Sequence, residues 1–178
     1  MLGHPDLRCP DNLPLRRVDR FQMVKTATVR LYFPADAFGN LICWRLESAY
    51  SHATIELDGT IYSATFPRVV AVSPYNTAFG MPPREGRAFS LVLSDEQHDK
   101  AKAWFSARVG TSYDVLAMLG WAFRVKRWQS ETHCYCFDSV YRCLAAAGVL
   151  QPTDDFVSGD ELIDALYSAN VVVYNNGQ

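Results

Sequence analysis

The sequence lacks the features that mark several broad classes of protein. It has no run of 18 apolar residues, so we predict no transmembrane helix. Residues 1–19 hold prolines and arginines but no apolar stretch of the kind a secretory signal needs. The 17 basic and 19 acidic residues give a net charge of −2, which argues against nucleic acid as a partner. We therefore expect a cytoplasmic protein, or one delivered without a signal peptide by a phage particle or a secretion system.

Cysteines are few, and they do not form a disulfide framework. Their number is odd and their spacing irregular, which favours free thiols in a reducing compartment, with one bridge as the alternative: Cys9, Cys43, Cys134, Cys136 and Cys143. No Cys-x-x-Cys pair occurs. A zinc site on His133, Cys134 and Cys136 is the weaker alternative, because their spacing is tight and a fourth ligand would have to come from far along the chain. We expect no metal and no other cofactor.

The chain is long and apolar enough to fold as one domain without disulfide bonds or structural metal ions. It has 178 residues, of which 49% are hydrophobic. We expect an irregular N-terminal arm over residues 1–22 and a single domain over residues 23–178. Predicted strands gather in the first half and predicted helices in the second, which favours an α+β fold. The expected architecture is an antiparallel β-sheet or small barrel packed against a layer of helices.

The predicted elements follow from alternation, capping and turn signals. Alternating or β-branched residues predict strands at residues 26–33, 52–57, 60–66, 69–73, 88–93 and 171–174. Capping boxes beginning at Ser94 and Ser158 predict helices that run to about residues 109 and 169. Two further helices are expected at residues 114–124 and 136–147. Residues 41–47 fit a strand and a short helix equally well.

One cysteine stands where a thiol can become a nucleophile. Cys136 is placed at the start of a predicted helix, whose unpaired N–H groups stabilise a thiolate and can also bind an oxyanion. Cys134 competes, but two residues upstream its side chain should point in another direction. Cys143 and Cys43 are expected to be small hydrophobic residues. An inert, buried thiol is the alternative interpretation of Cys136.

One histidine stands where it can serve that thiol as a base. His52 begins the first strand of a hairpin whose turn, Asp58-Gly59, favours the positive φ angles of tight turns. A general base needs a third group to orient it, and Ser63 on the partner strand should face His52. Glu56 is a less favoured substitute nearer the turn. His98 is expected on the solvated face of its helix, and a structural role for His52 is the alternative.

Three short motifs, taken in order, resemble a known family. They are Ser51-His52 followed by a strand and Asp58-Gly59, Tyr113-Asp114 before an apolar helix, and Cys136-Phe137-Asp138-Ser139-Val140. The order of histidine before cysteine is similar to the circularly permuted papain-like fold of the NlpC-type superfamily. That group includes the YiiX-like hydrolases and the lecithin-retinol acyltransferase-like enzymes. The resemblance covers roughly residues 24–150.

The resemblance implies a cysteine hydrolase with a defined set of residues. Cys136 would be the nucleophile, His52 the base and Ser63 the third catalytic residue, with Tyr50, Tyr113 and Asp138 beside the substrate. The substrate would be a peptide or acyl compound, with the amide bonds of bacterial cell-wall peptide as the commonest target. A thioesterase or acyltransferase is an alternative.

The third position departs from the family pattern. The family carries His, Glu, Asn or Asp where this chain has Ser63. A serine can hold an imidazole by a hydrogen bond, but it cannot compensate the charge of an imidazolium. A binding or inhibitory module that kept the fold and lost catalysis is therefore a second alternative.

Overall fold

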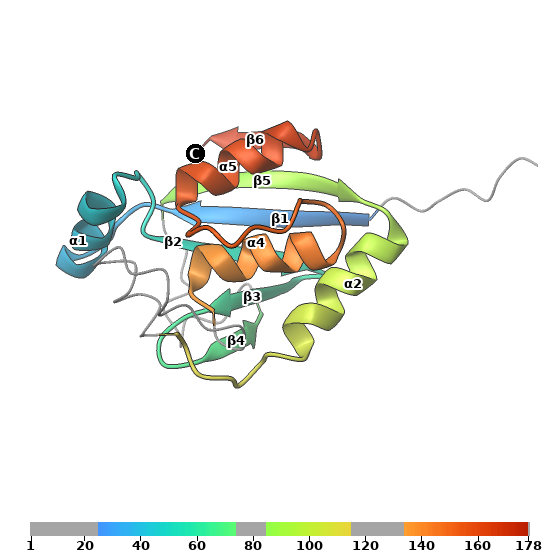
Figure 1. Ribbon diagram of the computed structural model, residues 1–178, viewed down its shortest axis with the longest axis horizontal. Helices are drawn as coiled ribbons and strands as arrows, with labels where there is room; N and C mark the ends of the chain where they lie inside the picture. The colour runs from blue at the N-terminus through green and yellow to red at the C-terminus, as the bar shows by residue number, and fades with distance from the viewer. Residues whose placement is uncertain (1–24, 74–84, 115–133, 178) are drawn as a thin grey trace, which may run out of the picture.

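A single antiparallel sheet organises the protein. The computed structural model describes residues 25–73, 85–114 and 134–177 (Figure 1). In these ranges six strands pair in the order β4-β3-β2-β1-β5-β6. Their bounds are β1 Lys25–Tyr32, β2 His52–Leu57, β3 Thr60–Ala64, β4 Val69–Val72, β5 Gly86–Leu93 and β6 Val172–Gly177. The α+β class is thus confirmed. The sheet is open, with β4 and β6 at its edges, rather than closed into a small barrel.

Four helices accompany the sheet in the described ranges. They are α1 Ala37–Leu46, α2 Asp95–Ser106, α4 Cys136–Ala146 and α5 Gly159–Ser168. Figure 1 shows α4 lying across the sheet, and α1 set apart at the end where β1 ends and β2 begins. Residues 41–47, which fitted two interpretations, belong mostly to α1. The predicted arm and most of the predicted helix at residues 114–124 lie outside the described residues.

Local signals produce the elements that frame the site. The capping boxes at Ser94 and Ser158 are both present, each with its reciprocal pair of hydrogen bonds. The predicted turn between β2 and β3 is also confirmed. Asp58 and Gly59 have φ angles of 50° and 71°, the left-handed values that a two-residue hairpin turn requires. The pairing of Leu57 with Thr60 closes that hairpin.

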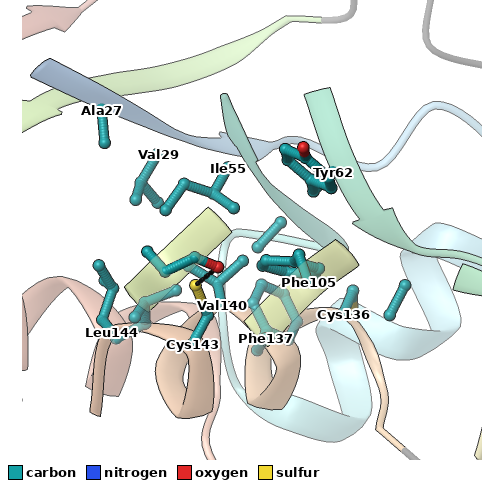
Figure 2. Packing of buried hydrophobic residues seen from close by; sticks show 14 of the residues in the cluster. Ala27, Val29, Ile55, Tyr62, Phe105, Cys136, Phe137, Val140, Cys143 and Leu144 are labelled. Carbon is teal, nitrogen blue, oxygen red and sulfur yellow. Dashed lines mark hydrogen bonds between the residues drawn. The ribbon is translucent and has the colours of Figure 1, made fainter. Parts of the chain in front are cut away.

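The main core lies between the sheet and the two helices α2 and α4. Side chains alternate along β2, so Ala53, Ile55 and Leu57 point to the core. Figure 2 shows Ile55 among the core side chains. From α4, Val140 and Leu144 are fully buried in the same cluster. Each such large aliphatic side chain stabilises the fold by about 1.5–3 kcal/mol when it leaves water. This packing fixes α4 against the sheet.

Cys143 belongs to this core, as the sequence predicted. Its thiol donates a hydrogen bond to the Ala101 carbonyl over 3.4 Å, which links α4 to α2 (Figure 2). Burial raises the pKa of Cys143 far above its ordinary value. A neutral thiol inside the core is inert and acts as a small hydrophobic residue.

The expectation of a solvated His98 was wrong. The side chain is fully buried. Its Nε2 lies 3.2 Å from a carboxylate oxygen of Asp58, and its Nδ1 lies 3.4 Å from one of Asp99. The reason is the β2–β3 turn, which lies over the polar side of α2, where Lys102 also pairs with Asp58. The polar face of α2 thus packs against the β2–β3 hairpin and is not exposed to solvent there.

Candidate active site

Cys136 is the first residue of α4. The preceding residue, Tyr135, is extended and makes no side-chain capping bond among the described residues, so it does not cover the first amides of the helix. Its hydroxyl instead donates to the Val157 carbonyl and accepts from the Val157 N–H. Ser139 donates to the Cys136 carbonyl over 2.7 Å and tightens the first turn. These contacts hold the cysteine at the helix start that the sequence predicted.

The sulfur of Cys136 is buried among hydrogen-bond donors. Burial raises the pKa of its thiol to about 11, because a thiolate would lose its hydration there. The backbone N–H groups of Ala53, Phe137 and Cys136 itself, with the hydroxyl of Tyr113, act in the opposite direction. Burial prevails, so the resting group is a neutral thiol. The same donors stabilise negative charge whenever it develops on the sulfur.

Tyr113 comes to the sulfur on a segment anchored by its backbone. The Tyr113 N–H donates to the Pro67 carbonyl over 2.9 Å, and the Asp114 N–H donates to the Cys134 carbonyl over 3.3 Å. The Tyr113 hydroxyl interacts with both the thiol and the backbone N–H of Cys136. Burial raises the pKa of Tyr113 well above its usual range, so the hydroxyl stays a neutral donor.

His52 and Ser63 form the second half of the site. The His52 Nε2 lies 2.9 Å from the Ser63 Oγ, the pairing expected from the hairpin. The His52 ring also stacks on Tyr32, with ring centroids 5.9 Å apart. The Tyr32 hydroxyl lies 3.2 Å from the Thr54 Oγ1. Ser63 is fully buried, so these contacts hold the imidazole in one orientation.

The two halves of the site lie beside consecutive residues at the start of β2. The sulfur reaches this strand at the N–H of Ala53, the residue directly after His52. By alternation the Ala53 side chain faces α4, whereas the His52 side chain belongs to the face that Tyr32 and Thr54 share. The structure thus brings Cys136 to Tyr113, and His52 to Ser63, around one short stretch of backbone. Proton transfer between Cys136 and His52 stays a prediction.

Tyr50, expected beside the substrate, is buried in the core. Its ring stacks on Phe33 at a centroid distance of 5.4 Å. It also fills the space left by Gly159 at the start of α5, where an added Cβ would lie 2.9 Å from the Cβ of Tyr50. Burial raises the pKa of Tyr50. These contacts give Tyr50 a packing role between α5 and the end of the sheet, and a substrate contact stays a prediction.

Asp138, also expected beside the substrate, is two residues after Cys136, in the first turn of α4. It is buried, and its Oδ1 accepts a hydrogen bond from the Arg142 Nε over 2.8 Å. Burial raises the pKa of Asp138 to about 6, although the Arg142 guanidinium opposes this.

Cys134 lies in surroundings different from those of Cys136. Burial, with the charge of Asp138, raises the pKa of Cys134 to about 12. The groups that act on Cys136 are instead Ala53, Phe137 and Tyr113. The predicted difference in direction between the two cysteines agrees with these two sets of neighbours.

The described residues contain neither a cluster of metal ligands nor a helix that could span a membrane. Within residues 25–73, 85–114 and 134–177, no group of three or more His, Cys, Asp or Glu side chains could hold a metal ion. His133, part of the zinc alternative, lies outside these ranges. In the same part of the chain, no helix is both long enough and apolar enough to span a bilayer.

Comparison with known sequences finds no relative of this chain. No protein-family model matches the chain, and no curated protein is significantly similar to it.

Proposed function

We propose that this protein is a cysteine hydrolase that cleaves an amide bond through a thioester on Cys136. The observation that supports the proposal is that Cys136 and the His52–Ser63 pair lie beside consecutive residues at the start of β2. Cys136 lies against the Ala53 amide at a helix N-terminus, and the preceding strand residue is His52, whose Nε2 is held by Ser63. A nucleophile, a base and a group that orients the base are what covalent acyl transfer needs, and we propose that His52 reaches the sulfur in the reaction.

The proposed reaction has two steps. His52 accepts the Cys136 thiol proton through Nδ1, because Nε2 faces Ser63. The sulfur attacks the carbonyl carbon, the C–N bond breaks, and the departing amine takes the proton from His52. Water then gives a proton to His52 and its oxygen attacks the thioester, which releases a carboxylic acid and restores the thiol.

Tyr113 supports both tetrahedral intermediates in this proposal. Its hydroxyl and the backbone N–H of Cys136 lie together beside the sulfur. Two such donors can bind the oxygen that becomes negatively charged when the carbonyl is attacked. Removal of one oxyanion donor typically costs about 10²–10³-fold in kcat. The resemblance to the permuted papain-like hydrolases suggests a cell-wall peptide amide, with thioesters and lipid acyl bonds as the other acyl donors of the same chemistry.

A binding module without catalysis is the second candidate. Two observations favour it: the pKa of about 11 for the buried thiol, and a serine in place of an acidic or amide group next to His52. A neutral thiol is a weak nucleophile, and Ser63 cannot balance an imidazolium charge. In this case the contacts of Cys136 and His52 would only stabilise the fold.

Selective alkylation distinguishes the two candidates. The native protein is treated with iodoacetamide at neutral pH, and each cysteine is mapped by mass spectrometry over time. The hydrolase predicts that Cys136 reacts faster than Cys134, which is equally buried, and that His52→Ala slows Cys136 by about tenfold or more. Cys134→Ala is the matched control and should leave the rate at Cys136 unchanged. Equal, slow labelling of Cys134 and Cys136, unaffected by His52→Ala, would support the binding module.

A further inference from the structure

Helix α1 turns its apolar side outward. Phe38, Leu41 and Trp44 are 58%, 56% and 75% exposed, and their spacing of three residues places them on one side of the helix. Gly39 is the only buried residue of α1. A helix of a soluble domain normally presents its large apolar side chains to the core. We call Phe38, Leu41 and Trp44 the α1 stripe.

The α1 stripe lies at the same end of the sheet as the candidate site. Helix α1 connects β1 to β2, so it follows Tyr32 and leads to His52 (Figure 1). Phe66, 73% exposed, follows β3 next to Pro67, whose carbonyl accepts the N–H of Tyr113. Two separate segments thus expose large apolar side chains around the end that carries Cys136 and His52. Isolated exposed apolar residues need no explanation, but a gathered set indicates an interaction surface.

The size of the α1 stripe argues against another protein as its partner. Large side chains bury about 150–250 Å² each when fully covered, so three partly exposed ones offer on the order of 400 Å². A standard protein–protein interface buries about 800 Å² on each partner. A lipid surface needs no complementary partner shape. It binds each inserted tryptophan, phenylalanine or leucine independently, and tryptophan is favoured at the boundary between headgroups and acyl chains.

The charges on α1 itself and on its two caps indicate the kind of lipid surface. Arg45 is the one basic residue of α1, whereas the flanking caps Asp36 and Glu47 are acidic. Helices that bind anionic lipids carry several lysines or arginines beside the apolar face. We propose that the α1 stripe docks the protein on the surface of a lipid bilayer by apolar insertion, without a requirement for anionic headgroups. Docking would bring Cys136 to the membrane surface, and the meaning of that position rests on the proposed function. The docking itself does not depend on the proposed function.

Vesicle flotation tests this inference. The full chain is mixed with phosphatidylcholine vesicles, and in parallel with vesicles that also contain phosphatidylserine, at low and high salt. We expect the protein to float with both kinds at either salt concentration. Trp44→Ser should lower the partition coefficient by about tenfold, since each fully buried apolar side chain contributes at least that factor. Phe38→Ser and Leu41→Ser should also weaken binding.

A matched control separates docking from general hydrophobicity. Tyr167 on α5 is 48% exposed, and Tyr167→Ser should leave flotation unchanged while thermal melts show that both variants stay folded. The inference is overturned if the wild-type protein stays in the soluble fraction, or if Tyr167→Ser weakens binding as much as Trp44→Ser. It is also overturned if binding requires phosphatidylserine and disappears in salt, or if sedimentation shows a dimer that Trp44→Ser dissociates. None of these results depends on hydrolysis by Cys136.

Discussion

Replacing Asp138 with asparagine should change how the stability of this protein depends on pH. Asp138 is buried in the first turn of α4, two residues after Cys136, and burial raises its pKa from 3.8 to about 6. A carboxyl with a raised pKa favours folding in its protonated form. Its contribution is therefore fully present below pH 3.8 and is lost as the pH rises through about 6. Asparagine keeps the size and an acceptor for Arg142 but has no proton to lose.

The size of the effect follows from the shift. The pKa rises by about two pH units, and each unit corresponds to about 1.4 kcal/mol. The wild-type protein should therefore lose about 3 kcal/mol relative to Asp138→Asn between acidic and neutral pH. The Arg142 guanidinium already offsets part of the free-energy cost of ionising the buried Asp138. Arg142→Gln should therefore increase the stability that is lost between acidic and neutral pH.

Chemical denaturation at a series of pH values measures the effect. The free energy of unfolding is compared between wild type and Asp138→Asn, and the exposed Asp154→Asn serves as the control for loss of one carboxylate. The reasoning is refuted if the difference between wild type and Asp138→Asn is constant across pH. It is also refuted if the wild-type protein gains stability relative to the variant as the pH rises.

Three further predictions concern the site and its support. Because the pKa of the Cys136 thiol is about 11, its alkylation rate should rise steadily with pH above neutrality; a flat rate would indicate a thiolate already formed. Ser63→Ala should cost about 1 kcal/mol in unfolding experiments and slow Cys136 alkylation, because His52 loses its orienting partner; an unchanged rate would contradict that role. Gly159→Ala should destabilise the fold by about 1–3 kcal/mol, because the new Cβ meets Tyr50; a thermal melt equal to wild type would contradict this packing.

Local signals in the sequence predicted much of the frame. The Asp58-Gly59 turn, the two capping boxes and the facing of His52 and Ser63 all depend on residues within a few positions or directly across a hairpin. Such short-range features follow from backbone geometry and alternation. They can therefore be predicted from the sequence alone.

The parts that could not be predicted depend on long-range packing. The contact of the Cys136 sulfur with Ala53 involves a backbone N–H, which leaves no mark on residue type. The residues next to His98 in the sequence are mostly polar, which suggests exposure. Its burial depends instead on the β2–β3 turn, which lies far away in the sequence. The sequence did not decide between helix and strand for residues 41–47. Phe38 and Trp44 of α1 are exposed, so the apolar pattern does not identify the buried side of the helix.

Trapping the acyl intermediate tests the central claim most directly. The protein is mixed with excess p-nitrophenyl acetate, release of p-nitrophenol is followed, and the acetylated residue is identified by mass spectrometry. We predict a rapid burst of about one equivalent per chain with the acetyl group on Cys136, lost in Cys136→Ser and slowed in His52→Ala. Slow acetylation without a burst, spread over other side chains and unaffected by either substitution, would contradict the assignment of Cys136 as the nucleophile.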